Sequence, residues 1–230
     1  MMKKPGRSMP DTKPLGIFGG TFDPVHLGHL RLAEEAAELL GLPNVRWIPA
    51  GQPRHRKAPQ EAAIHRLRMV QLALVGNPRF SVDASEVDSG EASYTVPTLE
   101  RVRSERGLRA PLVLLLGADA YAGLPTWHRW QEIFSLAHVA IAHRPGYPVE
   151  PDALPPALVA EHRQRAGEAE ESLKGLPAGK IFTFAMTPLA ISATQLRQLL
   201  AAGRSPRYLL PQPVIDYIEL HNLYRNPNGS

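Results

Sequence analysis

The amino-acid sequence predicts an α/β fold with a doubly wound parallel sheet, flanking helices and a C-terminal helical part. Short apolar runs alternate with helical patterns along the chain, and this order builds a parallel sheet with crossover connections. The 230 residues are 43% hydrophobic and 21% charged, which is ordinary for a globular protein with one full core. We therefore expect a single domain over residues 14–225.

The strands are expected at the apolar runs 15–18, 45–49, 80–82, 112–117, 138–142 and 181–184. Helices are expected between them, at 27–40, 61–75 and 96–105, with a shorter one after Thr126. In the first helix the apolar residues recur at helical spacing, and Gly41 follows its last turn as a stop signal. The predicted arrangement is Rossmann-like.

Three stretches depart from this rhythm. Residues 1–13 are basic and lack the apolar core of a secretory signal, so we expect a disordered tail. Residues 145–179 begin with prolines and become charged, which is typical of an exposed inserted helix; a lid or a subunit contact is the alternative. Residues 191–223 form two helical segments that Pro206 and Pro211 separate.

Composition excludes several classes of function. The chain has no cysteine, which rules out disulfides, thiolate metal sites and cysteine nucleophiles and fits a reducing cytoplasm. No apolar run approaches the length of a membrane span. The net charge of +4 mixes 26 basic with 22 acidic residues, so it favours locally bound phosphates over nucleic acid, which needs a denser basic face. The oligomeric state stays open, a homo-oligomer included.

The first chemical motif joins the first expected strand to the first helix, and it reads Gly19-Gly20-Thr21-Phe22-Asp23-Pro24-Val25-His26-Leu27-Gly28-His29. The glycines remove the Cβ atoms that keep a phosphate away from backbone N–H groups, and the helix start offers unpaired donors. His26 and His29 are three residues apart, so they project from one face of the helix. Together these features predict a binding site for a nucleoside triphosphate.

The second motif is Ile191-Ser192-Ala193-Thr194-Gln195-Leu196-Arg197. Ser192 is a candidate N-cap, Thr194 lies in the first turn, and Arg197 follows one turn later. Hydroxyls, unpaired N–H groups and a guanidinium can thus converge on phosphate oxygens. A simple helix cap is the alternative interpretation of this stretch.

Further polar segments follow the other expected strands, at 49–56, 117–119, 143–144 and 187–192. Ligands of doubly wound sheets bind beyond the carboxyl ends of the strands, where the strand order reverses. We therefore expect all of these segments, with both motifs, to border one crevice.

The strand followed by Gly-Gly-Thr-Phe, Asp-Pro and His-x-Gly-His resembles the nucleotidyltransferase superfamily of adenylyl- and cytidylyltransferases. Four further elements, in this order, narrow the resemblance to the bacterial nicotinate-mononucleotide adenylyltransferases: Ser93-Tyr94-Thr95, Pro125-Thr126-Trp127, Arg144-Pro145-Gly146-Tyr147-Pro148 and Ile191-Ser192-Ala193-Thr194. The match spans about 15–224. It implies transfer of AMP from ATP to nicotinic acid mononucleotide, giving deamido-NAD and pyrophosphate, with Mg²⁺ bound mainly through the ATP phosphates and no dedicated metal site.

The resemblance also implies roles for individual residues. His26, His29 and Arg197 would be catalytic. ATP and its phosphates would be bound by Gly19, Gly20, Thr21, Phe22, His55, Arg56, Asp119, Arg144, Ser192 and Thr194. The nicotinate would be bound by Tyr94, Thr95, Trp127 and His128.

Two positions depart from the family pattern. His128 stands where tyrosine is expected, and a backbone contact tolerates this change. Arg54 replaces the second proline of a Pro-Pro-His-Arg sequence, which makes a less rigid loop; Lys57 is a further candidate phosphate contact there. The alternatives are that Trp127 only packs in the core and that Asp119 only caps a helix.

Rival functions remain at this point. Within the superfamily the chain could adenylylate pantetheine phosphate or transfer CMP to an alcohol phosphate, although the Ser-Tyr-Thr and Thr-Trp elements imply an added pocket for an aromatic base. From other classes, it could be a nucleotide-binding regulator without turnover, or a histidine-based metallohydrolase. The last alternative lacks a third metal ligand.

Overall fold

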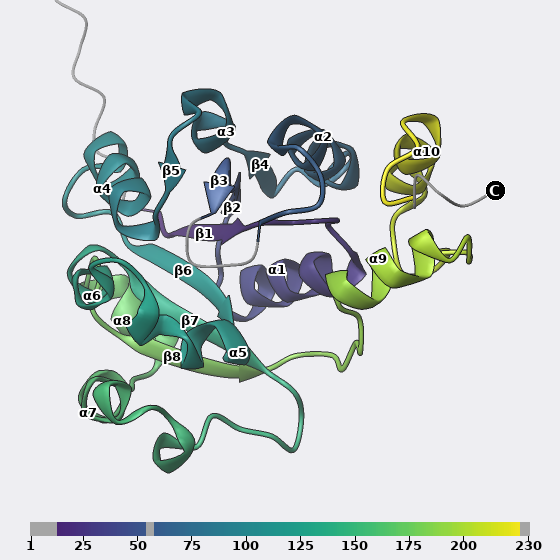
Figure 1. The fold of residues 1–230 in the computed structure, drawn as a ribbon. Coiled ribbons are helices and arrows are strands. Elements are labelled where there is room, and N and C mark those ends of the chain that lie inside the picture. The colour runs from purple at the N-terminus through teal and green to yellow at the C-terminus, as the bar shows by residue number, and fades with distance from the viewer. Residues whose placement is uncertain (1–12, 54–57, 226–230) are drawn as a thin grey trace, which may run out of the picture.

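The computed structural model describes residues 13–53 and 58–225, and its centre is a six-stranded parallel sheet with the order β4-β2-β1-β6-β7-β8 (Figure 1). The strands are β1 (Leu15–Gly20), β2 (Asn44–Pro49), β4 (Phe80–Val82), β6 (Leu112–Gly117), β7 (His138–His143) and β8 (Ile181–Ala185). Every strand expected from the sequence is present. The chain first builds outward from β1 through β2 and β4, then returns to place β6 on the other side of β1, so the doubly wound fold is confirmed.

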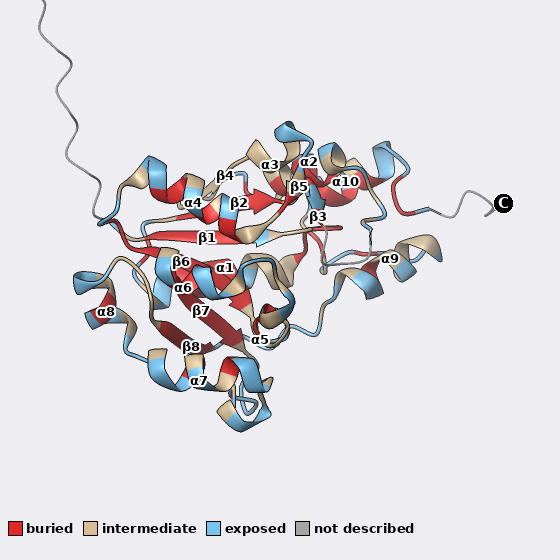
Figure 2. Cartoon of the chain, turned by 60° about the vertical axis from the view of Figure 1, so that its left-hand side comes forward, coloured by how far each residue is buried: buried red, intermediate tan, exposed pale blue. Residues whose placement is uncertain are grey.

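Helices cover both faces of the sheet (Figures 1 and 2). One face packs against α1 (Leu27–Leu39), α2 (Ala63–Ala73), α8 (Ala169–Gly175), α9 (Ala193–Ala201) and α10 (Gln212–Leu220). The other face packs against α4 (Thr95–Arg106), α5 (Ala118–Ala122), α6 (Ile133–Leu136) and α7 (Pro156–Arg165). In β6, Val113 and Leu115 enter the first layer while Leu114 and Leu116 enter the second. Burial on both faces explains why this strand is apolar throughout.

The helix boundaries follow the expected signals. After α1, Gly41 adopts a left-handed φ of 59° and the N–H of Leu42 donates to the carbonyl of Ala37 at 2.9 Å, which closes the helix end. At the start of α9, the Ser192 hydroxyl accepts a hydrogen bond from the N–H of Gln195 at 3.2 Å. Ser192 is therefore an N-cap, as predicted.

Short elements account for the differences from expectation. Helix α3 (Ser85–Ser89), helix α5 and the two-stranded sheet of β3 (Gln52–Pro53) with β5 (Ala92–Ser93) were not predicted, because segments of this length carry no periodicity. The helix expected after residue 126 is divided between the 3₁₀ turn η2 (Trp130–Glu132) and α6; a second turn, η1 (Leu124–Thr126), precedes it.

The inserted segment contains two helices rather than one. The 3₁₀ turn η3 (Pro151–Ala153) leads into α7, and α8 follows. Helix α7 is anchored, because Leu158 is buried and the His162 Nδ1 lies 2.9 Å from the hydroxyl of Tyr121 on α5. The expectation of an exposed helix therefore holds for the outer sides of α7 and α8.

Candidate active site

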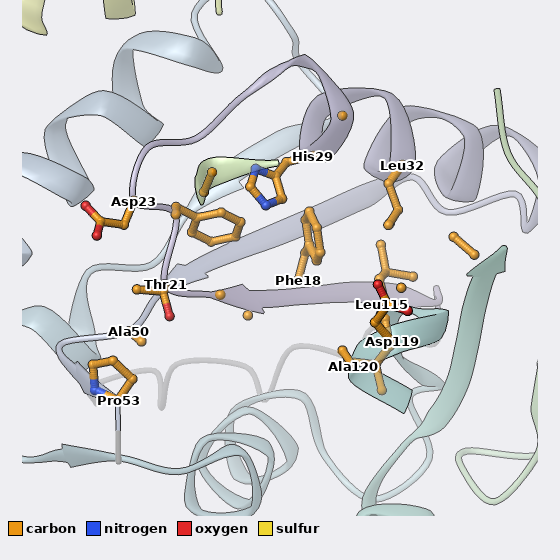
Figure 3. Close-up of a pocket in the computed structure, with 18 of the residues that line it drawn as sticks. Phe18, Thr21, Asp23, His29, Leu32, Ala50, Pro53, Leu115, Asp119 and Ala120 are labelled. Atoms are coloured by element: carbon orange, nitrogen blue, oxygen red, sulfur yellow. The ribbon is translucent and has the colours of Figure 1, made fainter. Parts of the chain in front are cut away.

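A cleft of about 1160 Å³ opens beyond the carboxyl ends of β1 and β6, the neighbouring strands between which the order of strand addition reverses (Figure 3). The sequence-predicted residues that line it are Gly19, Gly20, Thr21, Phe22, His26, His29, Tyr94, Thr95, Asp119, Trp127, Arg144, Ser192, Thr194 and Arg197. The structure thus brings the two distant motifs together. His128 does not line the cleft, and His55 and Arg56, with Arg54 and Lys57, lie outside the described residues.

The turn after β1 is shaped by one close contact. A Cβ on Gly20 would meet the ring of Phe22 at 2.8 Å, whereas a Cβ on Gly19 would meet nothing nearer than 4.0 Å. Phe22 itself has a left-handed φ of 49° and is buried against Trp47. Packing within the protein therefore requires glycine at position 20, and the absence of a side chain at Gly19 leaves its backbone accessible from the cleft.

The two histidines form a stacked pair at the start of α1. Their ring centroids are 3.6 Å apart at an interplanar angle of 24°. The backbone N–H of His26 donates to Nδ1 of His29 at 3.2 Å. Because Nδ1 accepts this hydrogen bond, neutral His29 carries its proton on Nε2, and one ring nitrogen becomes a fixed donor.

His26 is held neutral by its surroundings. Its side chain is only 6% exposed, and burial lowers its pKa to about 4. Its Nδ1 has no hydrogen-bond partner among the described residues. A Cβ on Gly28 would lie 3.1 Å from this nitrogen, so a side chain at position 28 would crowd the imidazole of His26. The sequence interpretation did not assign Gly28 this role.

Arg197 reaches the same end of the cleft from α9. One of its terminal nitrogens, Nη1, donates to the backbone carbonyl of Asp23 at 2.7 Å, and Nη2 donates to the hydroxyl of Thr194 at 3.2 Å. These contacts hold the guanidinium beside the turn that leads into His26. Two imidazoles and a guanidinium therefore border one space of a size that suits a polyphosphate.

The other wall of the cleft is aromatic. Trp127 lies partly buried against the apolar layer of α4 and α6 and lines the cleft. Tyr94 is the N-cap of α4, so the N–H groups of Thr95 and Val96 have no acceptor within the helix. The ring of His128 packs against Tyr94 with centroids 4.9 Å apart. This wall offers an aromatic plane beside N–H donors.

Asp119 and Arg144 lie on the rim after β6 and β7. Gly117 is the N-cap of α5 and Asp119 lies within its first turn, so the carboxylate is not a helix cap. Tyr147, in the loop after β7, is 77% exposed and also lines the cleft. The beginning of the inserted segment therefore contributes to the site.

Buried charged residues that the sequence interpretation missed hold the loops of the cleft in place. Arg66 is 1% exposed and donates to the backbone carbonyls of Thr21 at 2.6 Å, Gly51 at 2.9 Å and Glu61 at 3.1 Å. Burial lowers the pKa of its guanidinium. The local signal of this loop-holding role was the position of Arg66 on the buried, apolar face of α2.

Two carboxyl groups, the buried Glu35 and the half-buried Glu86, support the site in the same way. Glu35 on α1 accepts from the N–H of Thr187 at 2.9 Å and from its hydroxyl at 2.5 Å. Although burial acts to raise its pKa, these hydrogen bonds and Arg31 lower it. Glu86 on α3 lines the cleft and accepts from the Thr98 hydroxyl at 2.5 Å, and burial raises its pKa. Sequence reasoning had no signal for either carboxyl group.

The doubly wound sheet, with a glycine turn and paired histidines at its switch point, defines a nucleotidyltransferase-type α/β enzyme. The sequence model of the cytidylyltransferase-like family matches residues 17–199, and the chain belongs to this family. Within it, the chain belongs with the nicotinate-nucleotide adenylyltransferases, as its similarity to curated proteins shows.

A protein of Dechloromonas aromatica (strain RCB), named "Probable nicotinate-nucleotide adenylyltransferase", is 62% identical over 215 residues, which are 94% of this chain and 99% of that protein. A protein of the same name from Pseudomonas putida (strain W619) is 50% identical over 215 residues, with 93% of this chain and 96% of that protein covered.

Solved structures confirm the fold. The nicotinic acid mononucleotide adenylyltransferase of Plasmodium falciparum, complexed with NaAD, superimposes with a TM-score of 0.65 at 17% identity, covering 92% of this chain and 97% of that one. The same protein complexed with APC gives a TM-score of 0.63. Among the described residues, no helix is long and apolar enough to cross a membrane.

Proposed function

We propose that this protein transfers AMP from ATP to nicotinic acid mononucleotide, forming deamido-NAD and pyrophosphate in NAD biosynthesis. The observation that carries the proposal is the joining, in one cleft, of a phosphate-binding end made by His26, His29 and Arg197 and an aromatic wall at Trp127. The 62% identity to a named nicotinate-nucleotide adenylyltransferase supports it. We place the enzyme in the cytoplasm, in keeping with a sequence that has no cysteine.

The reaction needs no protein nucleophile. An oxygen of the mononucleotide's phosphate attacks the α-phosphorus of ATP in line, a new P–O bond forms, and the bond from the α-phosphorus to the oxygen that joins it to the β-phosphorus breaks. The electron pair of that bond leaves with pyrophosphate. Catalysis therefore consists of alignment and of stabilising negative charge on the phosphoryl oxygens.

Each phosphate-binding residue has a part in that stabilisation. We assign the Nε2–H of His29 as a donor to a phosphate oxygen, because its Nδ1 is occupied by the N–H of His26. Arg197 supplies a permanent positive charge and a planar pair of donors. His26 is buried and neutral near pH 7, so its contribution is a hydrogen bond rather than a charge.

The acceptor needs a different kind of contact. We propose that the pyridine ring stacks on Trp127 and that its carboxylate accepts from N–H groups at the start of α4 and at residue 128. An anion gains from the positive end of the helix dipole at this position. Tyr94, which packs against His128, would keep the two donor segments together.

ATP enters as its magnesium complex in this proposal. Among the residues that the structure describes, no group of three or more histidine, aspartate or glutamate side chains is placed to hold a metal ion. The ion would therefore be held by the phosphates and water, and it would add positive charge to the leaving pyrophosphate.

The test is a product assay. Purified protein is incubated with ATP, Mg²⁺ and one acceptor in each reaction: nicotinic acid mononucleotide, nicotinamide mononucleotide or pantetheine phosphate. A further reaction contains CTP, Mg²⁺ and an alcohol phosphate. Chromatography and mass spectrometry should identify deamido-NAD and pyrophosphate in the first reaction. Nucleotide binding without any dinucleotide would overturn the proposal and favour a regulator.

A further inference from the structure

The last described turn of the chain returns to the phosphate-binding end of the cleft. Tyr224 lies beyond α10 and is 1% exposed. Its hydroxyl donates to Oδ1 of Asp23 at 2.8 Å, and its backbone N–H donates to Oε1 of Glu61 at 2.8 Å. A phenol from the C-terminal end is thus bonded to the loop between β1 and α1.

Asp23 links this phenol to the guanidinium that faces the cleft. Its carboxylate is buried and also accepts from the N–H groups of Gln60 at 2.7 Å and Glu61 at 3.4 Å. Its backbone carbonyl accepts from Nη1 of Arg197 at 2.7 Å, while its Oδ2 lies 3.9 Å from the same nitrogen. In Figure 3 the carboxylate of Asp23 points away from His29.

The geometry leaves the carboxylate between two competing partners. While the Tyr224 hydroxyl occupies Oδ1, the Oδ2 of the carboxylate stays 3.9 Å from Nη1 of Arg197, whose hydrogen bonds go to the Asp23 backbone carbonyl and the Thr194 hydroxyl. Burial, and then the charge of Asp23, raise the pKa of Tyr224, so the phenol remains a donor. Without it, Oδ1 keeps only the longer contact to Glu61, and the nearest opposite charge available to a buried carboxylate is Arg197.

We propose that Tyr224 is a positioning residue for ATP: by holding the Asp23 carboxylate, it keeps the Arg197 guanidinium available to the triphosphate. The proposal rests on the function proposed above. It also gives the C-terminal helical part a task at the site, because the Tyr224 hydroxyl bonds directly to the Asp23 carboxylate.

The experiment compares Tyr224→Phe with Tyr217→Phe. Tyr217 is a matched control, because it also belongs to the C-terminal part and its hydroxyl lies 2.9 Å from Nδ1 of His65, away from the residues that line the cleft. We expect Tyr224→Phe to weaken Mg-ATP binding, measured by calorimetry, by roughly tenfold, as the loss of a hydrogen bond to a charged group predicts. The KM for the mononucleotide should stay unchanged, as should both constants in Tyr217→Phe.

A double-mutant cycle with Arg197→Ala separates positioning from a general loss of stability. If Tyr224 acts through Arg197, Tyr224→Phe should change the ATP affinity much less when Arg197 is already absent. An equal fold-change in both backgrounds, or an unchanged ATP affinity in Tyr224→Phe, would overturn the proposal. Should Tyr224→Phe be recovered unfolded, Glu61→Ala removes the acceptor of the Tyr224 N–H instead, and the same cycle applies.

The calorimetric readout also keeps the two proposals distinguishable. If wild-type protein binds Mg-ATP but forms no deamido-NAD, the proposed function fails while the comparison of affinities still tests Tyr224. If deamido-NAD forms and the affinities of wild type and Tyr224→Phe agree, only the role of Tyr224 fails.

Discussion

The stacked histidines present one oriented donor to the cleft, and removing it gives the first prediction. His29→Ala should lower kcat by roughly 10²- to 10³-fold, because a well-aimed donor to a developing charge is worth about that factor. The fold should persist, since the main contacts of the ring are with His26 and Phe22 at one end of α1. Steady-state kinetics with circular dichroism checks both expectations.

The control is His65→Ala. His65 bonds to Tyr217 between α2 and α10 and does not line the cleft, so turnover should stay near the wild-type value. Near-normal kcat in His29→Ala would remove this histidine from the mechanism.

Trp127 gives the second prediction. Trp127→Ala should raise the KM for nicotinic acid mononucleotide by roughly tenfold or more, because stacking and apolar contact with the pyridine ring are lost. The KM for ATP should change little, because the residues proposed to bind the phosphates lie on the opposite wall. Trp127→Phe keeps an aromatic plane, so its KM for the mononucleotide should lie between those of the wild type and Trp127→Ala. Equal effects on both substrates would show that Trp127 only packs in the core.

At this scale the sequence predicted residues within local motifs and missed those with distant partners. His26, His29 and Arg197 occur in recognisable spacings and meet in one cleft. Asp23 stood inside a motif, yet its bond to Tyr224 spans 201 positions, and no local pattern announces such a contact. Arg66 and Glu35 were missed for the same reason.

Helix α1 carries the third prediction, because its first turn must accommodate a buried ring. Alanine is usually favoured over glycine in a helix by about 1 kcal/mol. Here the new Cβ would lie 3.1 Å from Nδ1 and 3.2 Å from Cε1 of His26, which displaces the imidazole. Gly28→Ala should therefore lower kcat by roughly tenfold or more. The melting temperature should change little by comparison.

Gly175→Ala is the matched control. Gly175 ends α8, and a Cβ there would meet nothing within 4 Å, so activity should not change. If Gly28→Ala retains full activity, catalysis does not depend on the present position of the His26 imidazole.

Among the elements, the long ones were predictable and the short ones were not. The apolar run of β6 and the periodic pattern of α1 each carry enough residues to show a period. Helix α3 is held instead by tertiary contacts: the backbone carbonyl of Glu86 would lie only 2.1 Å from a Cβ on Gly51. Such close packing against another loop leaves no trace in the local sequence.

The fourth prediction concerns the whole molecule. Burial lowers the pKa of His26 to about 4 and also lowers the pKa values of His138 and His162. All three are neutral in both states above pH 6.5, but below it the unfolded chain binds protons that the native protein does not. The free energy of unfolding should therefore fall as the pH drops below about 6.5, by up to about 1.4 kcal/mol per pH unit for each histidine, and for His26 the fall should continue until about pH 4.

Denaturant unfolding at pH 7.5, 6 and 5 tests this expectation. Glu86 acts in the opposite direction, because burial raises its pKa and the native protein then binds a proton at a higher pH than the unfolded chain does. The three histidines outnumber it, so a net loss of stability is expected. Equal or higher stability at pH 5 would contradict the lowered histidine pKa values.

For the whole fold, the sequence predicted the parallel sheet and the gathering of motifs at its carboxyl edge, because both follow from the alternation of strands and helices. The strand order β4-β2-β1-β6-β7-β8 then placed the glycine turns of β1 and β6 side by side. The hydrogen bond from Tyr224 to Asp23 was not predictable, since a buried tyrosine beyond a short helix has no distinguishing pattern.

The contact between Gly20 and Phe22 constrains how this chain can diverge. A Cβ at position 20 would lie 2.8 Å from the Phe22 ring, so position 20 cannot acquire a side chain while that ring stays in place. A lineage that acquires a side chain at position 20 must first have lost the aromatic ring two residues later. The geometry of the turn therefore sets the order of the two substitutions. Reconstructed ancestral sequences should show the loss of the ring before the gain of a side chain at position 20.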